Sequence, residues 1–462
     1  MDAVVQPKEQ QKVVVGLGQT GQACARFLKE QGYDVTVVDS RAVPPNFDAL
    51  KQDFPDIEFC LGGLDQATLC NAGEIVVSPG VSLHEPALQS ALDAGVSIIG
   101  DIELFRRYVS EPVIAITGSN AKSTVTTLVG DMLRDAGYDA IVAGNIGVPV
   151  MDLLNAKRSA DMYVLELSSF QLETTSNLKA QVATILNISA DHMDRYDSLD
   201  SYVEAKQRIY MGAENVVHLC SDPLTAPRDA LPDGGNIFQF TSAEPAHQQF
   251  GLRIIDGEQW LAFEEVLILP TAALKIKGKH NYLNALAALA LGYCVGLTFE
   301  QMAKTLRGFS GLPHRCQHVA EHNKVDFYND SKGTNVGATL AAIEGIGPEI
   351  EGQIVLLAGG NGKGADFKEL APAVSKYVRH IVLIGRDAKK MARDLDGATV
   401  ISFASSMSEA VTQCIEYASE GDSVLLSPAC ASFDMFNGFE DRGDKFVAEV
   451  ASQIVSLQQG AC

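Results

Sequence analysis

The sequence predicts an α/β protein built from three domains. At 462 residues, the chain is too long for one ordinary hydrophobic core. Short apolar runs that lead into turns of small residues recur at residues 13–21, 113–124 and 354–364, and a helical pattern follows the first two. Alternating strand and helix patterns predict parallel sheets covered by helices. We therefore expect three domains, at residues 1–101, 102–311 and 312–462.

The first domain opens on a glycine motif. Gly16, Gly18 and Gly21 lie between an apolar strand and a helix, and a second strand ends at Asp39. This spacing is typical of a Rossmann-like, dinucleotide-binding unit, in which the acidic residue contacts a ribose hydroxyl. Glycines at these positions can also serve only to pack a helix against a strand. The motif by itself therefore leaves the ligand open.

The second domain carries a candidate phosphate loop. Residues 113–116 are apolar and β-branched, residues 117–121 are small, and Lys122 opens a helix. Backbone N–H groups of such a loop surround phosphates, the lysine reaches the terminal ones, and the next hydroxyl holds Mg²⁺. Ile116 and Ala121 replace glycines of the general pattern, and a chance Lys-Ser-Thr at a helix start is the alternative. The candidate nucleotide-binding residues are Gly118, Ser119, Asn120, Ala121, Lys122, Ser123 and Thr124.

Chemically active side chains follow two more strands of this domain. Glu166 lies late in an apolar strand at 163–167, and a second strand, at 182–188, leads into a loop with His192. Ligands bind at the carboxyl ends of parallel strands, so both side chains are expected beside the phosphate loop. Burying an unpaired carboxylate is costly, which favours a cation near Glu166. A structural salt bridge for Glu166 and a satisfied histidine remain alternatives.

Lys206 lies on the apolar stripe of a predicted helix at residues 201–210. A lysine in such a place either extends its amine to solvent or has a depressed pKa and a chemical use. The helical pattern by itself favours the first outcome.

The rest of the chain adds polar loops. Residues 220–275 break into short strands, which predicts a small antiparallel insertion. His280, Asn281 and Asn284 begin an apolar helix, where they cap it or contact a ligand. In the third domain, polar residues follow apolar strands at three places. These residues are Asp330, Ser331, Lys332, Thr334, Asn335, Lys363 and the segment 428–434.

Composition excludes several classes of protein. The net charge of −22 disfavours non-specific binding to nucleic acid, so anionic ligands must be met by local lysine, arginine, Mg²⁺ and helix termini. Nine scattered cysteines form neither a disulfide framework nor a zinc ribbon. No apolar stretch is long enough to span a membrane, and the first residues lack the features of a signal peptide. We expect a cytoplasmic monomer.

Taken together, the motifs resemble the Mur ligase family over essentially the whole chain, apart from residues 220–275. Ala121 departs from the family's commoner glycine but leaves the lysine and hydroxyls in place. The segments that carry the resemblance are 16–21, 117–124, 165–173, 191–196, 280–284, 312–315, 329–335 and 427–434.

This resemblance implies a P-loop ATPase-like central domain with a mostly parallel sheet, between two Rossmann-like domains. It also implies ATP-dependent amide synthesis, in which D-glutamate is added to UDP-N-acetylmuramoyl-L-alanine through an acyl phosphate. The product would be a cytoplasmic precursor of peptidoglycan. ATP would be the co-substrate, with two Mg²⁺ ions, and domain closure would keep water from the intermediate.

The resemblance also implies roles for individual residues. Lys122 would stabilise the transferring phosphoryl group, and Glu166 with Ser123 would hold Mg²⁺. His192 would bind the second metal or the substrate carboxylate, and Lys206 matches a carbamylated lysine that ligates metal. Further ATP contacts would be Asn281, Asn284, Arg315, Asp330 and Lys332. The UDP-sugar would contact Gln19, Thr20, Asp39, Ser40, Arg41, Asn145, Ser168, Ser169 and Gln171. D-glutamate would contact Thr334, Lys363, Ser432 and Phe439.

Two other classes of function compete with this interpretation. The glycine motif with Asp39 alone would suit a nicotinamide-dependent oxidoreductase, which leaves Lys122 and the third domain without a purpose. A nucleotide-binding regulatory module would not need Glu166, His192 and Lys206 together. Within the family, the loops at 359–363 and 429–432 favour D-glutamate over the substrates of a sister ligase or a folylpolyglutamate synthetase.

Overall fold

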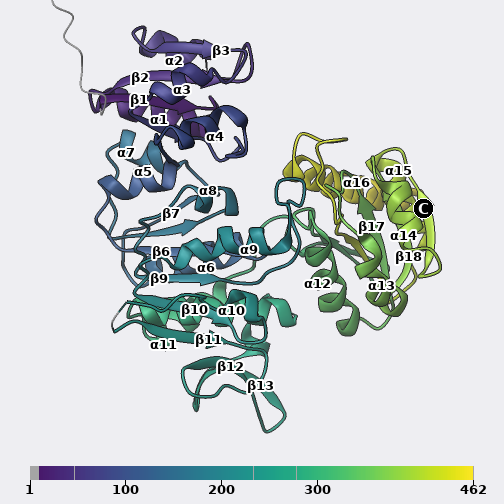
Figure 1. Ribbon diagram of the computed structural model, residues 1–462. Helices are drawn as coiled ribbons and strands as arrows, with labels where there is room; N and C mark the ends of the chain where they lie inside the picture. The colour runs from purple at the N-terminus through teal and green to yellow at the C-terminus, as the bar shows by residue number, and fades with distance from the viewer. Residues whose placement is uncertain (1–9, 46, 233, 277, 461–462) are drawn as a thin grey trace, which may run out of the picture.

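The computed structural model describes residues 10–45, 47–232, 234–276 and 278–460. Three α/β domains follow one another along the chain, each built on its own sheet (Figure 1). The first domain, in purple, lies at one end of the central domain, in teal, and the third, in green and yellow, lies beside the central domain. The predicted fold class is confirmed.

The first domain has a parallel sheet of order β3-β2-β1-β4-β5. Its strands are β1 (Gln11–Val15), β2 (Asp34–Asp39), β3 (Glu58–Leu61), β4 (Glu74–Val77) and β5 (Ser97–Ile99). Its helices are α1 (Gln19–Glu30), α2 (Phe47–Asp53), α3 (Gln66–Asn71), α4 (Pro86–Asp93) and α5 (Asp101–Tyr108). The loops that follow β1, β2 and β4 meet at the carboxyl edge of this sheet.

The glycine motif of this domain lets α1 start directly against β1. A Cβ atom on Gly21 would lie 1.8 Å from the carbonyl oxygen of Gly16, so no larger residue fits there. Ser78 Oγ donates a hydrogen bond to the same carbonyl (2.7 Å) and ties the loop after β4 to it. The motif therefore has at least the packing role that the sequence left open.

The central domain has nine strands in the order β14-β13-β12-β11-β10-β9-β6-β8-β7. These are β6 (Val113–Thr117), β7 (Ala140–Gly144), β8 (Met162–Glu166), β9 (Val182–Ile185), β10 (Asn215–Leu219), β11 (Asn236–Phe240), β12 (Gln249–Ile255), β13 (Glu258–Phe263) and β14 (Val266–Pro270). Its helices are α6 (Lys122–Asp135), α7 (Val150–Asn155), α8 (Ser169–Glu173), α9 (Leu199–Gln207), α10 (Lys279–Cys294) and α11 (Phe299–Gly308). Seven of these strands, from β7 to β12, pair in parallel.

The prediction of a separate antiparallel insertion at 220–275 is wrong in part. β11 and β12 pair in parallel with β10 and continue the central sheet. Only β12, β13 and β14 pair in antiparallel fashion. β11 exposes its first two residues, so its sequence lacks the continuous apolar run of a buried parallel strand. Its partner, β10, lies about 20 residues earlier, and local sequence carries no record of that pairing.

The third domain has the order β15-β16-β20-β17-β18-β19, and β15 is its antiparallel edge strand. Its strands are β15 (Gln317–His322), β16 (Val325–Asn329), β17 (Ile354–Gly359), β18 (Val378–Ile384), β19 (Val400–Phe403) and β20 (Ser423–Leu426). Its helices are α12 (Val336–Ile346), α13 (Ala371–Tyr377), α14 (Ala388–Asp394), α15 (Met407–Tyr417) and α16 (Phe439–Gly460). Because β20 lies between β16 and β17, the loops after these three strands are neighbours.

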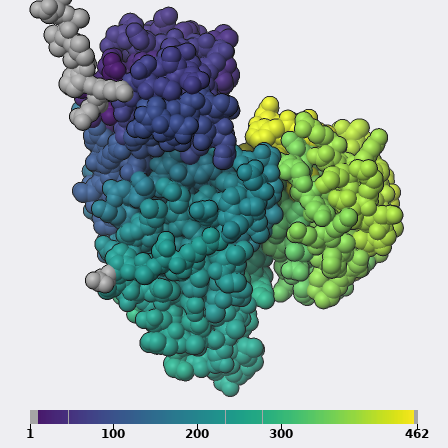
Figure 2. Space-filling model, in the orientation of Figure 1, coloured from purple at the N-terminus to yellow at the C-terminus, as the bar shows by residue number. Residues whose placement is uncertain are grey.

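The first and central domains share a hydrophobic core. One buried cluster contains Val14 and Leu28 of the first domain together with Tyr163 and Leu165 of the central sheet. The rings of Phe105 and Tyr163 meet edge to face with centroids 5.2 Å apart. The buried clusters of the third domain contain residues of that domain alone, as far as the structure describes them. The space-filling view accordingly shows one continuous body of two domains, with the third joined along its side (Figure 2).

Candidate functional site

Two cavities lie at the carboxyl edge of the central sheet. One, of about 320 Å³, is lined by residues of the central and third domains. The other, of about 960 Å³, is lined by residues of the first and central domains. The phosphate loop, at the end of β6, contributes Asn120, Ala121 and Thr124 to the smaller cavity.

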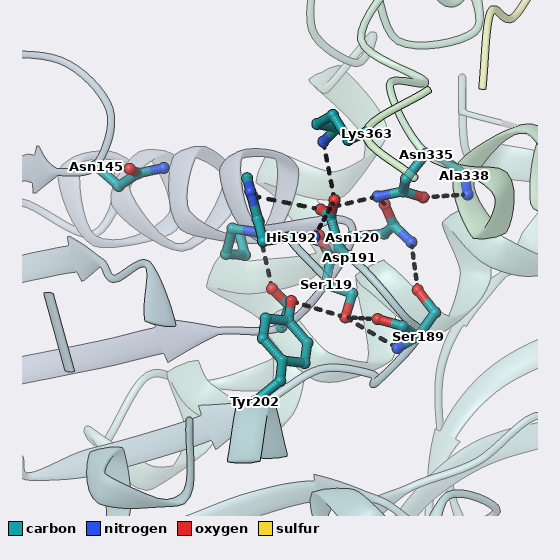
Figure 3. Close-up of polar contacts among 12 residues, drawn as sticks. Ser119, Asn120, Asn145, Ser189, Asp191, His192, Tyr202, Asn335, Ala338 and Lys363 are labelled. Carbon is teal, nitrogen blue, oxygen red and sulfur yellow. Dashed lines mark hydrogen bonds and ion pairs between the residues drawn. The ribbon is translucent and has the colours of Figure 1, made fainter. Parts of the chain in front are cut away.

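The phosphate loop is held by the loop that follows β9 (Figure 3). Ser119 Oγ accepts a hydrogen bond from the backbone N–H of Ser189 (2.9 Å) and lies 3.1 Å from the hydroxyl of Tyr202. The N–H of Asn120 donates to Asn187 Oδ1 (2.8 Å). These contacts fix the backbone of the loop before any ligand arrives, which is the preorganisation that phosphate binding requires.

Lys122 curls back over this loop. Its Nζ donates to the carbonyl oxygens of Gly118 (2.8 Å) and Ser119 (2.9 Å). Burial lowers the pKa of Lys122, although Glu166 and Asp191 act against that shift. The amine is therefore held where an incoming phosphate oxygen can take the place of a carbonyl.

Glu166 is the last residue of β8 and is buried. Its Oε1 accepts a hydrogen bond from Asn145 Nδ2 (2.8 Å), and no ion pair among the described residues includes it. Its Oε2 is buried and has no hydrogen-bond partner among the residues that the structure describes. The salt-bridge alternative is thus not observed, and the unpartnered oxygen fits a carboxylate that awaits a cation.

His192 lies in the loop after β9 with a positive φ of 57°. Its Nε2 is 3.6 Å from Asp191 Oδ2, and its ring meets the edge of Phe170 with centroids 4.9 Å apart. Burial lowers the pKa of His192, with Asp191 acting against the shift and Lys363 adding to it. A neutral imidazole at this edge is able to ligate a metal ion.

Lys206 is 1% exposed, in the last turn of α9. Its Nζ donates to Gly118 O (2.9 Å) and Thr117 Oγ1 (3.2 Å), directly beneath the phosphate loop. Burial, and then Lys122, lower the pKa of Lys206 well below its usual value. The side chain does not extend to solvent, so the first of the two outcomes open from sequence is not observed. A chemical use of the amine stays a prediction.

The nucleotide-binding candidates from α10 and the third domain meet at the smaller cavity. Asn281, Asn284, Arg315, Asp330 and Lys332 all line it. Arg315 Nη2 donates to Ser123 Oγ (2.7 Å), across the two domains. The hydroxyl of Ser123, a predicted metal ligand, is thus engaged by an arginine in this state of the protein.

Asp330 is buried, and both of its carboxylate oxygens are hydrogen-bonded within the protein. Its two carboxylate oxygens accept hydrogen bonds from the N–H of Cys316 (3.2 Å) and from Ser427 Oγ (2.7 Å). Burial raises the pKa of Asp330 to about 6. Lys332 lies 3.8 Å over the ring of Phe439, and burial lowers its pKa to about 8.

The UDP-sugar candidates mostly meet at the larger cavity. Asp39 pairs with Arg41 through Nη2 (2.6 Å) and Nε (2.8 Å), and it accepts the N–H of Leu17 (2.7 Å). Burial opposes ionisation, but these hydrogen bonds hold the pKa of Asp39 at about 2. The candidates that line this cavity are Gln19, Thr20, Asp39, Ser40, Arg41, Asn145 and Gln171.

Ser168 and Ser169 are not lining residues of the larger cavity. Ser168 is the N-cap of α8, where its hydroxyl accepts the N–H of Gln171 (3.2 Å) in a reciprocal capping box. Ser169 is buried in the first turn of this helix. Both serines were predicted as substrate contacts from the family resemblance. A serine at position 168 is also explained by the helix itself, because it caps α8.

The four D-glutamate candidates are described, but none of them lines either cavity. Lys363 Nζ instead pairs with Asp191 Oδ1 (2.9 Å) across the domain boundary (Figure 3). Ser432 is buried, and its carbonyl accepts the N–H groups of Met435 and Phe436. Thr334 lies on the loop after β16, and Phe439 is the first residue of α16.

Sequence reasoning missed several lining residues. Arg195 lines the larger cavity together with the loop 78–82 and His84, and Cys316 lines the smaller one. His280, noticed in the sequence but given no role, also lines the smaller cavity. Arg195 lies in the polar segment 191–196. That polar composition is the one feature of the sequence that could have indicated a binding role for Arg195.

Comparison with known proteins gives consistent matches along the chain. Three family models match it: "Mur ligase MurD-like, N-terminal domain" at residues 10–100, "Mur ligase middle domain" at 116–292, and "Mur ligase, glutamate ligase domain" at 314–430.

Similar curated proteins extend over nearly the whole chain. The UDP-N-acetylmuramoylalanine--D-glutamate ligase of Pseudomonas putida is 52% identical over 439 residues, which cover 95% of this chain and 96% of that protein. The protein of the same name from Acinetobacter baylyi is 50% identical over 441 residues, covering 95% of this chain and 97% of that protein. Among solved structures, the MurF ligase of Thermotoga maritima in complex with ADP aligns with a TM-score of 0.63 at 16% identity. That alignment covers 98% of this chain and 100% of the other, and it supports the fold.

Proposed function

Since this chain belongs to the Mur ligase family, we propose that it joins the amine of D-glutamate to the L-alanine carboxylate of UDP-N-acetylmuramoyl-L-alanine, with hydrolysis of ATP. The reaction is a step in the synthesis of peptidoglycan precursors. One observation carries the proposal: the buried amine of Lys206 lies against the phosphate loop, and Glu166, with its unpartnered oxygen, ends the neighbouring strand beside them. The two alternatives from other classes leave that grouping unexplained.

The chemistry proceeds in two steps. A carboxylate oxygen of the UDP-linked substrate attacks the γ-phosphorus of ATP, the bond to the β-phosphate oxygen breaks, and ADP leaves. The amine of D-glutamate then attacks the acyl carbon, a tetrahedral intermediate collapses, and inorganic phosphate departs as the amine loses its proton. Lys122 and Arg315 supply positive charge beside the phosphate loop, where the charge of the transferring group develops.

We propose Glu166, His192, Ser123 and a carbamylated Lys206 as the residues that hold two Mg²⁺ ions. The described residues contain no group of three or more histidine, cysteine or carboxylate side chains around one point. Oxygen ligands must then come from the phosphates and from a modified lysine as well. When bound, the ions would neutralise the charge of ATP and of the substrate carboxylate.

Carbamylation of Lys206 follows from its surroundings. An amine must be unprotonated to attack CO₂, and burial depresses the pKa of Lys206. The attack forms a nitrogen–carbon bond and releases one proton, which leaves an anionic carbamate. That anion would lie beside Lys122, a cation that favours it, within the phosphate loop.

We assign the larger cavity to the UDP-sugar, because its volume suits a nucleotide-linked sugar and it opens toward Glu166 through Asn145. The smaller cavity receives ATP. D-glutamate is assigned to the third domain, where Lys363 would exchange Asp191 for a substrate carboxylate. Thr334, Ser432 and Phe439 would join Lys363 in contacting D-glutamate only after the third domain moves.

We place the domain boundaries at 1–101, 102–311 and 312–462. The ranges of the three family models, 10–100, 116–292 and 314–430, support this division. A monomer is expected, and a cytoplasmic site of action follows from the proposed substrates, ATP and a UDP-sugar. Of the helices that the structure describes, none has the length and apolar character that a membrane crossing requires.

Phosphate release by the purified protein tests the function. The assay contains Mg²⁺, ATP and UDP-N-acetylmuramoyl-L-alanine, with D-glutamate, L-glutamate, L-lysine or meso-diaminopimelate in separate reactions. Release with D-glutamate alone supports the proposal, and a K122M variant should be silent. Release with another amino acid would move the protein to a sister activity, and silence with all four would contradict a ligase.

A further inference from the structure

The first turns of α16 lie against the ligand loops of the third domain and carry a buried arginine. Arg442 is 0% exposed and is the largest of the fully buried side chains among the described residues. None of the ion pairs between described residues includes it. Its burial lowers its pKa to about 10, so it keeps its charge at neutral pH.

The guanidinium of Arg442 joins two loops. Its Nη2 and Nε donate to the carbonyl oxygen (2.7 Å) and the hydroxyl (2.9 Å) of Ser331. Its Nη1 donates to the carbonyl oxygen of Cys430 (3.1 Å). Ser331 lies between Asp330 and Lys332, both of which line the smaller cavity.

Cys430 belongs to the other loop, which follows β20. Two residues later this loop reaches Ser432, a candidate contact for the amino acid. The backbone of Ala431, between them, pairs with Asn361 in the loop that carries Lys363. One side chain thus connects the nucleotide loop to the loops expected to bind the amino acid.

Other contacts of the same turns hold the nucleotide loop from a second direction. Ser331 Oγ donates to the carbonyl oxygen of Phe439 (2.8 Å), and Asn329 Nδ2 donates to that of Gly443 (3.3 Å). A Cβ atom on Gly443 would lie 2.3 Å from His314 Nδ1, next to the arginine that reaches Ser123. The start of α16 therefore meets both the nucleotide loop and the segment that enters the third domain.

A packing role alone does not account for an arginine here. Burying a charge with no carboxylate in hydrogen-bond contact is costly, although the charges of Asp434 and Asp330 offset part of that cost. An apolar side chain of similar volume would fill the space at less cost. A guanidinium instead offers five N–H groups in a rigid plane, which is suited to satisfying several buried oxygens at once. The carbonyl oxygen of Ser331 belongs to the loop after β16, and that of Cys430 belongs to the loop after β20. Because the planar guanidinium donates to both oxygens, it fixes the distance between the two loops.

We propose that Arg442 is a positioning residue that locks the nucleotide loop to the amino-acid loop, so that Asp330, Lys332 and Ser432 are presented in a fixed relation. The naming of the two ligands rests on the proposed function. The coupling itself does not, because it follows from the hydrogen bonds of Arg442 to the two loops.

The test compares R442M, R442K and S331A with wild type. Three quantities are measured: the Kd of ADP by calorimetry, the KM of D-glutamate, and the Kd of UDP-N-acetylmuramoyl-L-alanine. In R442M we expect the first two to rise by about tenfold or more, since a loop displacement of about 1 Å has effects of that size. The affinity for the UDP-sugar should stay within about twofold, because it binds in the first and central domains. In R442K, the Kd of ADP and the KM of D-glutamate should rise less than in R442M.

K445M is the matched control. Lys445 lies one turn along α16 and is exposed. It forms an ion pair with Asp441 (2.9 Å), and its amine lies 5.3 Å from the centre of the Phe436 ring. Its replacement should change none of the three quantities. If R442M lowers the melting temperature but leaves both the ADP affinity and the KM of D-glutamate unchanged, Arg442 is merely structural and the proposal is wrong. An equal loss of UDP-sugar affinity would also overturn it, since the effect would then be general.

S331A keeps the test decisive if R442M does not fold. It removes the hydroxyl that bridges Arg442 Nε and Phe439 O but leaves both backbone carbonyls in place. We expect both the Kd of ADP and the KM of D-glutamate to rise by a smaller factor, about threefold. The Kd of ADP needs no turnover. A wild-type protein that released no phosphate would therefore contradict the ligase function, while the effect of Arg442 on ADP binding could still be measured.

Discussion

Lys206 shows how a single buried amine links stability to chemistry. Its Nζ has two oxygen partners and no carboxylate among the described residues, directly below the phosphate loop. Because the pKa of Lys206 is lowered in the folded protein, the unfolded chain holds this proton up to a higher pH than the folded one. Stability therefore rises with pH through this group, and the amine is kept in the form that reacts with CO₂.

Replacing Lys206 by methionine should separate these two effects. We expect K206M to lower phosphate release by about a thousandfold or more, since a metal ligand is lost. In bicarbonate-free buffer, its stability relative to wild type should be greatest at low pH and should shrink as pH rises, because wild type alone gains from deprotonation. Urea unfolding between pH 6 and pH 9 measures this.

K304M, on an exposed position of α11, is the control for the lysine replacement. It should leave both activity and the pH dependence as in wild type. With ¹³C-bicarbonate, a carbamate resonance should be present in wild type and missing from K206M. A wild-type level of activity in K206M would contradict the assigned role of Lys206.

Asp101 is a second buried group whose protonation affects stability. It begins α5, accepts a hydrogen bond from Gln171 Nε2 (3.1 Å), and its Oδ1 has no partner among the described residues. Burial raises its pKa to about 6. The folded protein therefore holds this proton between about pH 4 and pH 6, where the unfolded chain has lost it, and stability falls as pH rises through that window.

Replacing Asp101 by asparagine should remove this fall of stability with rising pH. A shift of about two pKa units corresponds to about 3 kcal/mol at most, so we expect D101N to be more stable than wild type by about 1 to 2 kcal/mol at pH 8. At pH 4 the two proteins should be nearly equal. D229N, in an exposed loop, is the control, and urea midpoints at both pH values are the measurement. A loss of stability at pH 8 would show that the ionised carboxylate is needed by Gln171.

At the scale of elements, α6 begins under backbone strain. Its N-cap residue, Ala121, has a φ of 65°, in the left-handed region that disfavours residues with a Cβ atom. The preceding residues are held by hydrogen bonds from the loop after β9, which leaves Ala121 to absorb the change of direction. The glycine that is commoner at this position in the family would adopt this conformation without strain.

A121G should therefore stabilise the protein. Relief of the left-handed conformation is worth about 1 kcal/mol, and the greater freedom of glycine in the unfolded chain offsets part of it. We expect a net gain of about 0.5 kcal/mol. A136G is the matched control, because Ala136 ends the same helix at a φ of −83°, where the same change should cost about 0.5 kcal/mol. Thermal unfolding of the two variants measures both changes in stability. If A121G and A136G lost stability equally, strain at Ala121 would be excluded.

At the scale of the whole molecule, Arg195 joins the first domain to the loop of His192. Its Nη1 and Nη2 donate to the carbonyl oxygens of Pro79 (2.9 Å) and Val81 (3.1 Å), and Nη2 also pairs with Glu173 (3.2 Å). Its guanidinium lies 4.1 Å over the ring of Phe170, which also contacts His192. One wall of the larger cavity and the histidine loop thus share their supports.

R195Q should weaken the site for the UDP-sugar. Glutamine cannot reach all three oxygens, so the loop after β4 should loosen and the Kd of the UDP-sugar should rise by about tenfold. Neither Arg195 nor the residues it holds line the smaller cavity, which we propose for ATP, so the affinity for ADP should not change. R134Q, an exposed arginine on α6 paired with Asp131, serves as control. Calorimetry measures the Kd of both ligands. If R195Q lost as much affinity for ADP as for the UDP-sugar, the effect of Arg195 would not be local.

The sequence by itself determined the strand–loop–helix units, the position of Lys122 and the placement of Glu166 and His192 at strand ends. These features are local: apolar runs, small residues and helix starts constrain the backbone within a few residues. They also fixed the family, because its motifs lie at the ends of such units.

Only the tertiary structure decided the features that depend on distant contacts. It buried Lys206 where its helix pattern favoured solvent, and it placed β11 and β12 in parallel with the central sheet. It gave Arg195 and Arg442 their partners in other loops. It also paired Lys363 with Asp191 of the central domain. Burial, strand pairing and the hydrogen bonds between loops are set by residues far apart along the chain, and no local pattern in the sequence records which of them will meet.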